Sequence, residues 1–408
     1  MAGGAMVLHL HRGWRFASAI SILLLSATAA AGPLSVLPAS QLLSARLQAN
    51  QGQALDHDPL SPFGAEEVQA FLKAAAKADT IADPMERCLQ YPDPPGSHWT
   101  PEGVQVYCRY RLQRTLGFDE FKALIEEGRA AEVDRRLGEW TTDTQGHPEA
   151  LWRFVNENFS SETPESRRLL ESWKQQSPQS AFAHAASGFS FLNAAWAARG
   201  AAYSADTAQS KWESMDKILP RVEGDLRMAA RLDGTLAMPY AVMIKAGMLV
   251  SDRALMQEAT SRGWRTDQAS MPLYNAIAME AMPRWGGSVE AQAGLLEVIK
   301  REAPRHPLLL TVRATILADQ ADLYACHCAS QTERAAYRSV FDDVAVFSDL
   351  RAVGKNALDN GQNELALVYL TEALRFDRND QRTLQARNQA LSGVSSDISR
   401  AVNESGAD

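Results

Sequence analysis

The 408-residue sequence has none of the short motifs that identify several large enzyme classes. It contains no glycine-rich phosphate-binding loop with lysine, no Gly-x-Gly-x-x-Gly turn after a strand, and no His-Glu-x-x-His pair for zinc. Gly188-Phe189-Ser190 lacks the second glycine and the strand–turn–helix setting of a nucleophile elbow. These absences argue against common enzyme chemistry, although acid–base pairs that meet only in the fold leave no such motif.

Basic charge and strand-like alternation are scarce as well. The formal net charge is −8, and no basic stripe runs along the chain. An acidic chain of this kind argues against nucleic acid or an anionic membrane as the main partner. No period of two recurs, and no Asn-Gly turn separates alternating segments, so the sequence does not predict a sheet.

The first 31 residues have the pattern of a cleavable secretory signal. Arg12 and Arg15 precede an apolar run over residues 16–25, and small residues follow at 27–31. The run is shorter than the roughly 20 residues that a membrane span needs. We therefore expect a periplasmic or secreted protein with no membrane span after cleavage. An uncleaved N-terminal anchor is the alternative.

The chain has only four cysteines. In an exported protein, cysteines are first of all candidates for disulfides. Cys88 and Cys108 flank a proline-rich turn over residues 91–96, and a bridge across a loop of this size stabilises a fold by about 3 kcal/mol. We predict this pairing. Two free buried thiols, or a bridge to Cys326 or Cys328, are the alternatives.

Helical periodicity begins near residue 65. Residues 32–64, rich in Gly, Pro, Ser and Gln, predict a flexible lead-in, and residues 391–408 predict a tail. From residue 65 onward, apolar residues recur at the spacing of one helix face. Thr100 followed by Pro101 is a typical helix start, because threonine caps the helix and proline suits its first turn.

A period in the low thirties indicates stacked helix pairs. Pro239, Pro272 and Pro307 each precede an apolar helical run and are spaced by 33 and 35 residues. This spacing is typical of tetratricopeptide-type pairs. We therefore predict a helical domain over residues 65–302, with a cysteine-bracketed loop at 88–108. C-terminal helical repeats are expected over residues 303–390.

Residues 347–380 resemble one tetratricopeptide repeat along its whole length. Gly361 lies where the two helices of such a repeat separate, and Arg378 replaces the usual proline at the exit. The usual small positions, where the helices cross, are occupied by Gly354, Ala366 and Ala373. The predicted fold is all-α, with stacked antiparallel helix pairs in a tetratricopeptide-like α-solenoid whose core grows by repetition.

Three further stretches carry a family resemblance: Ala-Trp-Ala-Ala-Arg-Gly at 195–200, Arg-Gly-Trp at 262–264, and Pro-Arg-Trp-Gly-Gly-Ser at 283–288. On these residues, the chain from about 107 to 302 is similar to a bacterial family known as domain of unknown function 4034. The resemblance implies a helical, tetratricopeptide-like fold. It implies no activity, cofactor or catalytic residue.

The stretch at 283–288 contains the first pair of candidate binding residues. Its two glycines permit a tight turn, and Ser288 can cap the helix that follows. Arg284 and Trp285 are predicted to hold a carboxylate or an aromatic group of a partner, since both residue types are common binding anchors. The alternative is structural, with Trp285 filling a seam between helix pairs and Arg284 pairing with a local acid. Arg199 has the same two interpretations.

A second candidate pair comes from the repeat-like unit at 347–380. The first helix of a tetratricopeptide pair lines the concave groove, and the resemblance assigns ligand contacts to its fifth and ninth positions. Here these are Arg351 and Lys355. We predict that they receive an acidic peptide or a C-terminal carboxylate, because arginine offers a bidentate donor pair. A solvated surface is the alternative.

Three other clusters are assigned no chemistry. The Cys-His-Cys triplet at 326–328 has metal-ligand residue types, but three adjacent residues of a helix point in three directions, so we expect no metal. His184, in an alanine-rich run, is expected to be a packed polar residue. The Asp-His-Asp triplet at 56–58 lies in the lead-in, where no rigid shell preorganises chemistry. We expect no catalytic residue and no cofactor.

The sequence therefore favours an interaction module of the cell envelope that binds or scaffolds a protein or peptide through its concave face. A hydrolase with an unrecognised site, acting on envelope material, is the alternative. A structural element without a discrete site is a third interpretation. A pocket with converging His, Asp or Glu favours the enzyme, and a groove lined by Arg, Tyr and Trp favours binding.

Overall fold

The computed structural model describes residues 61–200, 206–321 and 337–394. In these ranges the chain forms α-helices and short 3-10 helices and no strand, which confirms the predicted all-α class. The predicted signal segment, most of the lead-in, the triplet at 326–328 and most of the tail lie outside the described residues. Within the described ranges, no helix is both long and apolar enough to cross a bilayer.

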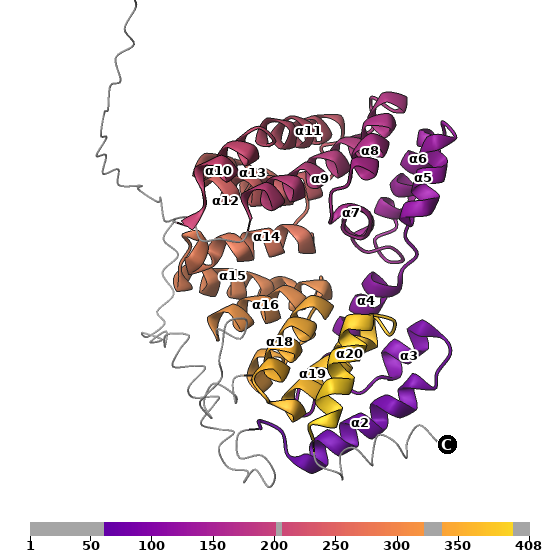
Figure 1. Ribbon diagram of the computed structural model, residues 1–408, viewed down its shortest axis with the longest axis vertical. Helices are drawn as coiled ribbons and strands as arrows, with labels where there is room; N and C mark the ends of the chain where they lie inside the picture. Colours follow the sequence, from indigo (N-terminus) through magenta and orange to yellow (C-terminus); the bar gives the residue numbers. More distant parts are fainter. Residues whose placement is uncertain (1–60, 201–205, 322–336, 395–408) are drawn as a thin grey trace, which may run out of the picture. The chain divides into compact units, whose positions relative to one another are not determined.

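Within each described range, the helices follow one another along the chain (Figure 1). The first are α2 (Ala65–Asp79), α3 (Pro84–Gln90), α4 (Pro101–Leu112), α5 (Phe118–Glu126), α6 (Ala130–Thr142) and α7 (Ala150–Phe159). The middle of the chain forms α8 (Pro164–Gln176), α9 (Ala181–Arg199), α10 (Gln209–Asp216), α11 (Leu219–Leu232), α12 (Met238–Val250) and α13 (Arg253–Thr266). The last are α14 (Met271–Ala281), η2 (Pro283–Trp285), α15 (Val289–Glu302), η3 (Pro307–Leu309), α16 (Leu310–Gln320), α18 (Phe347–Asp359), α19 (Asn363–Phe376) and α20 (Gln381–Ser392).

Helix starts that depend on local hydrogen bonds lie where the sequence predicts them. The Thr100 hydroxyl accepts a hydrogen bond from the Gly103 amide at 3.1 Å, and α4 begins at the next residue. The Ser288 hydroxyl accepts one from the Ala291 amide at 3.2 Å, and α15 follows. Each cap satisfies one of the amides that the first turn of a helix leaves free. Both predicted caps are confirmed.

The prolines of the predicted period open successive helices. Pro239 and Pro272 lie in the first turns of α12 and α14, and Pro307 begins η3, directly before α16. Proline suits this position because the first turn does not use its missing amide. α12 packs on α13 and on α14, and α14 packs on α15 and α16. The period thus marks every second helix, α12, α14 and α16, with α13 and α15 between them.

The unit at 347–380 consists of two packed helices, α18 and α19, with Gly361 in the break between them. A Cβ atom on Gly354 would lie only 2.8 Å from Cγ of Leu370, so this position needs glycine where the helices cross. The predicted helix pair is confirmed. Its assignment as a tetratricopeptide repeat stays a prediction.

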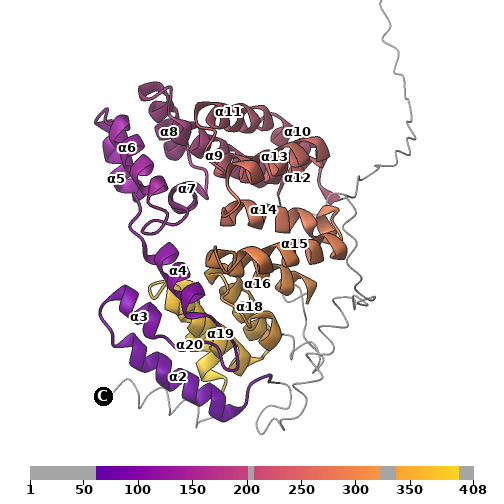
Figure 2. The ribbon, with the colours of Figure 1, turned by 180° about the vertical axis from the view of Figure 1, so that it is seen from behind.

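The N-terminal helices lie beside the C-terminal pair, as both ribbon views show (Figures 1 and 2). Phe63, near the end of the predicted lead-in, is 1% exposed, and its ring contacts Tyr369 of α19 edge-on at 6.0 Å. The guanidinium of Arg87 in α3 donates to the carbonyl oxygens of Leu374 and Arg375, both at 3.1 Å. These contacts join the two parts that the sequence interpretation separated at residue 302.

A buried group of charges, here called the terminal junction, fixes this contact. It comprises Arg87, Cys88, Asp93, Glu372 and Arg375. The Arg375 side chain is 1% exposed, and its Nε donates to the Cys88 carbonyl at 2.7 Å. Its Nη1 lies 2.8 Å from Asp93 and 3.0 Å from Glu372. A buried cation of this kind is tolerated because acids and carbonyls surround it.

The predicted disulfide belongs to the same region. Cys88 and Cys108 are bonded, with an S–S distance of 2.10 Å, which confirms this pairing. The bridge ties α3 to α4, and both cysteines are fully buried. It therefore holds the Cys88 carbonyl where Arg375 donates to it.

Candidate functional site

The predicted binding residues Arg284 and Trp285 both contact other parts of the chain. Arg284 is 54% exposed, and its Nη1 lies 2.8 Å from a carboxylate oxygen of Asp319. The Trp285 ring packs edge-on against Trp196 of α9, with a centroid distance of 5.6 Å. These contacts are those of the structural alternative. A binding role for the two residues stays a prediction.

Arg351 and Lys355 lie on α18 and are partly open to solvent. Arg351 approaches Asp380 at 3.6 Å and lies over the Phe347 ring, 5.2 Å from its centroid. Lys355 pairs with Asp359 one turn along the same helix. Each cation thus has an acid neighbour, so a ligand would have to compete with these pairs.

Arg199 is also engaged within the fold. Its guanidinium lies 5.8 Å from the Trp196 ring centroid and 5.1 Å from that of Trp212, and it donates to the Gly200 carbonyl. The residue is 9% exposed. These contacts support the structural interpretation of Arg199.

His184 is packed against polar groups, as the sequence predicts, but those groups belong to a site. Its Nδ1 lies 2.8 Å from Oδ1 of Asp225 in α11. The Ser187 hydroxyl donates to Oδ2 of the same carboxylate at 2.6 Å. Lys174 of α8 lies 3.1 Å from Oδ2. Asp225 therefore joins α8, α9 and α11.

The close crossing of α9 and α11 explains why these groups meet. α9 begins at a Ser180 cap, and its alanine-rich sequence leaves room for a neighbour. A Cβ atom on Gly188 would lie 2.7 Å from Cγ and Cδ2 of Leu226, so only glycine lets α11 approach this closely. Asp225 and Arg221 are on the part of α11 that this crossing brings near α9.

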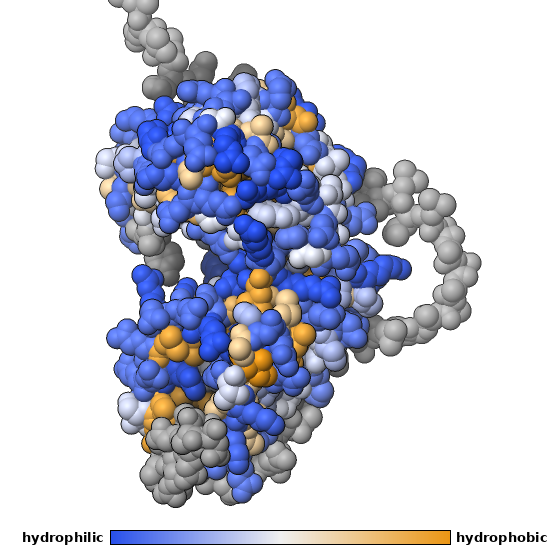
Figure 3. Space-filling model, turned by 90° about the vertical axis from the view of Figure 1, so that its right-hand side faces the viewer, coloured by the Kyte–Doolittle hydropathy of each residue, from blue (hydrophilic) through white to orange (hydrophobic). Residues whose placement is uncertain are grey.

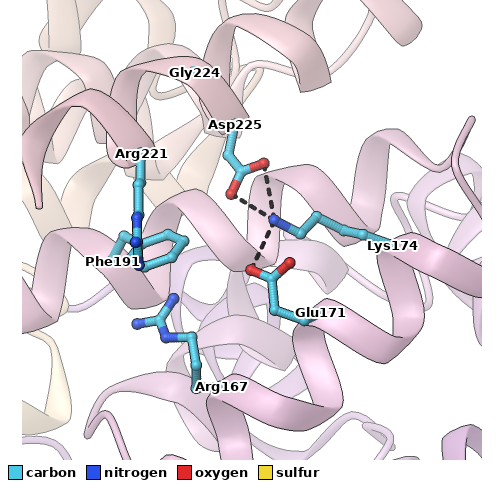
Figure 4. Close-up of a pocket in the computed structure, with 7 residues that line it drawn as sticks. All are labelled: Arg167, Glu171, Lys174, Phe191, Arg221, Gly224 and Asp225. Carbon is cyan, nitrogen blue, oxygen red and sulfur yellow. Dashed lines mark hydrogen bonds and ion pairs between the residues drawn. The ribbon is translucent and has the colours of Figure 1, made fainter.

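An open pocket of about 520 Å³ lies between the three helices (Figure 4). A volume of this size falls within the range of small-ligand sites. We call it the Phe191 pocket, after its one aromatic side chain. The residues that line it are Arg167, Glu171, Lys174, Phe191, Arg221, Gly224 and Asp225.

Two acids on one side of the pocket share one lysine, which leaves one negative charge in excess there. Lys174 lies 3.0 Å from Glu171 and 3.1 Å from Asp225. Burial alone would raise the pKa of Asp225, but hydrogen bonds from His184 and Ser187 and the charge of Lys174 hold it below its ordinary value. Asp225 is thus ionised at neutral pH and fixes its neighbours.

The arginines on the other side are less completely paired. Arg167 stacks on Phe191, with Cζ 3.4 Å from the ring centroid, and its Nε and Nη2 bind Glu162. Its Nη1 is buried and has no hydrogen-bond partner among the residues that the structure describes. Arg221 lies 5.6 Å from the same ring centroid, and no ion pair to it is found within the described ranges. Figure 4 shows the two guanidinium groups pointing toward one another beside Phe191.

The rest of the described surface shows no comparable cluster of charged and aromatic side chains around a pocket. On the face seen in Figure 3, hydrophilic residues dominate the upper part and apolar patches gather in the lower part. The exposed large apolar side chains of the described residues lie on three different helices, at Leu89, Val250 and Val289. In the same part of the chain, no group of three or more His, Cys, Asp or Glu residues is placed to hold a metal ion. The Phe191 pocket is therefore the candidate site.

Comparisons with known proteins add no family to this picture. Neither a protein-family model nor a curated protein matches the chain. The resemblance carried by residues 195–200, 262–264 and 283–288 stays a prediction. The site consequently has to be interpreted from its own chemistry.

Sequence analysis did not find the pocket. Its cations come from α8 and α11, and its aromatic ring comes from α9. Arg167, Phe191 and Arg221 are far apart in sequence and form no short motif. Gly188 was the one available signal, because a glycine inside an alanine-rich helix indicates a close helix crossing.

Proposed function

We propose that the protein is an exported helical-repeat module that binds a protein or peptide partner through an acidic group held in the Phe191 pocket. The observation that carries this proposal is the pair of guanidinium groups of Arg167 and Arg221, which face one another beside Phe191 without a full set of partners. Like charges repel at short range, so this arrangement is stabilised most when an anion lies between them.

Two features support a location in the cell envelope. Residues 1–31 have the basic, apolar and small-residue succession of a secretory signal. Cys88 and Cys108 form a disulfide, and disulfides persist mainly in oxidising compartments such as the periplasm. Retention of the N-terminal segment as an anchor is the alternative.

A photo-crosslinking phenylalanine analogue at Gly224 tests the proposal in the native compartment. Gly224 lines the pocket, and a Cβ atom added there meets no atom within 4 Å. Gly294 in α15 is the matched control, because a Cβ atom there also meets nothing within 4 Å. We expect one defined partner to be cross-linked from Gly224 but not from Gly294, and Arg221→Glu to abolish the product. Identical products from both positions, or none from Gly224, would contradict the proposal.

A hydrolase remains the second candidate because His184 is oriented by Asp225, as a catalytic base would be. The arrangement is incomplete, however. Ser187 is fully buried and donates to Asp225, so it does not lie in the position of a nucleophile activated by the imidazole. Release of fragments from isolated cell-wall material by the wild-type protein, and not by His184→Ala, would favour this second function.

A further inference from the structure

The two arginines of the Phe191 pocket offer donors for which no acceptor is found among the described residues. Nε and Nη2 of Arg167 donate to Glu162, and the buried Nη1 has no acceptor among the described residues. Arg221 comes from the opposite helix and has no ion pair within the described residues. Their guanidinium groups approach from opposite sides of the space beside Phe191 (Figure 4). An acceptor placed there would meet Arg221, and it would reach Nη1 of Arg167 once that buried group turns toward it.

The charges around the pocket set the charge of the ligand. Arg167 is balanced by Glu162, and Lys174 is shared by Glu171 and Asp225. Lys174 therefore sits between two acids, and Arg221 is the cation left without one. Counted together, the three cations balance the three acids, so the pocket is neutral before a ligand binds. A ligand with one negative charge can pair with Arg221 and adds the smallest excess of negative charge. A dianion would carry a further negative charge into a site that already contains Glu171 and Asp225, and like charges repel.

The donor type also matters. A guanidinium is planar and presents parallel N–H groups, which match the two oxygens of a carboxylate. A lysine ammonium in the same place would act as a point charge without this match. The one lysine of the pocket is already paired with two acids. The available donors are thus guanidinium groups, which bind a planar carboxylate better than an ammonium group does.

We infer that the Phe191 pocket binds a single peptide carboxylate, supplied by a C-terminus or by an Asp or Glu side chain, between Nη1 of Arg167 and the guanidinium of Arg221. This inference rests on the proposed function, since it specifies the acidic group of the partner. It excludes a phosphate group as the preferred ligand.

Fluorescence anisotropy with four labelled peptide pools of equal length tests the inference on the full chain. One pool has a free C-terminus and no acidic residue, and a second is amidated with one Glu. A third is amidated with one phosphoserine, and a fourth is amidated without any acid. We expect the first or the second pool to bind and the fourth not to bind. The phosphoserine pool is expected to bind no more tightly than the better carboxylate pool.

Two variants sharpen the result, and Arg305→Ala, at an arginine that is 75% exposed, is the control. Arg221→Lys should weaken carboxylate binding by roughly tenfold, because the bidentate contact is lost while the charge remains. Glu171→Gln removes one negative charge and should improve phosphoserine binding more than carboxylate binding. Both variants should leave the thermal midpoint close to that of the wild type.

The outcomes separate the inference from the proposed function. If phosphoserine peptides bind more than about tenfold tighter than carboxylate peptides, the carboxylate inference is overturned while anion recognition stands. If no pool binds and Gly224 also gives no cross-link, the proposed function fails as well. If all four pools bind alike, recognition does not involve a charged group and both are wrong.

Discussion

The terminal junction and the Phe191 pocket both combine arginines and carboxylates, yet they differ in how fully the charges are matched. In the junction, Arg375 is 1% exposed and contacts a carbonyl and two carboxylates. In the pocket, Arg221 is exposed and lacks an ion pair within the described ranges. Burial explains the difference, because an unpaired charge is costly only where water is excluded.

The comparison contrasts a structural site with the proposed binding site. The junction must be complete for the N-terminal helices to pack on α19. Arg221 is exposed to solvent, so the lack of an ion pair among the described residues costs little stability and leaves its guanidinium available to the proposed partner. Changes in the junction should therefore alter stability, and changes in the pocket should alter binding.

Arg375→Met should have the largest effect on stability. It leaves the Cys88 carbonyl, the Asp93 carboxylate and the carboxyl group of Glu372 without their shared donor, and each buried acceptor that stays unsatisfied costs about 1–3 kcal/mol. Urea unfolding monitored by circular dichroism measures this loss. Arg305→Met, at an exposed arginine, should change the free energy of unfolding by less than about 0.5 kcal/mol. Equal losses for the two variants would contradict the structural role of the junction.

The pH dependence of stability should also originate partly in the junction. Burial raises the pKa of Glu372 to about 8, from 4.5, so the folded chain keeps a proton that the unfolded chain releases. Its contribution is full below about pH 4.5 and is lost as the pH rises toward 8, by a few kcal/mol at most. Thermal midpoints of Glu372→Gln should fall less steeply over this range than those of the wild type.

Glu149 has a pKa that burial also raises to about 8, so Glu372→Gln should remove only part of the slope. Glu149→Gln should remove the part of the pH dependence that comes from Glu149. The slopes of the two variants can then be compared. An unchanged slope in Glu372→Gln would mean that this carboxyl is ionised in the folded protein.

The disulfide should stabilise the junction without serving the pocket. Replacing Cys88 and Cys108 by Ser should cost about 3 kcal/mol in the free energy of unfolding. Peptide binding per folded molecule should stay as in the wild type, because the bridge lies on α3 and α4 and the pocket on α8, α9 and α11. Loss of binding at a temperature where the variant is folded would contradict the claim that the junction and the pocket are independent.

Gly188→Ala should affect both properties, since the new Cβ would lie 2.7 Å from Leu226. Overpacking of this kind costs about 1–3 kcal/mol, and moving α11 displaces Arg221 from Arg167. Thermal unfolding and peptide anisotropy measure the two effects. Gly294→Ala in α15, which lies outside the pocket and where an added Cβ atom meets no described neighbour within 4 Å, is the matched control and should lower neither stability nor binding.

Features that depend on neighbours in sequence were predictable. The caps at Thr100 and Ser288 and the helix-opening proline at 239 need only the residues that follow them. The Cys88–Cys108 bridge closes a short loop, so its spacing was informative. Most of the correct fold predictions therefore rest on local hydrogen bonds and on the closure of a short loop.

Features that depend on distant contacts were not predictable. The bond from Arg375 to the Cys88 carbonyl spans 287 positions, and no periodicity indicates it. The contact of His184 with Asp225 spans 41 positions and arises only because α9 and α11 cross at Gly188. Sequence analysis consequently identified His184 as a packed residue without its partner, and it missed both arginines of the pocket.

The most direct test of the central claim is Arg221→Ala, studied by thermal unfolding and by anisotropy with the carboxylate peptide pool that binds best. The incomplete charge pattern predicts a free energy of unfolding within about 0.5 kcal/mol of the wild type. Binding should weaken by roughly tenfold or more. A destabilised variant would show that Arg221 stabilises the fold. A stable variant that binds the peptides as tightly as the wild type would show that Arg221 does not contribute to binding. Either result would contradict the account.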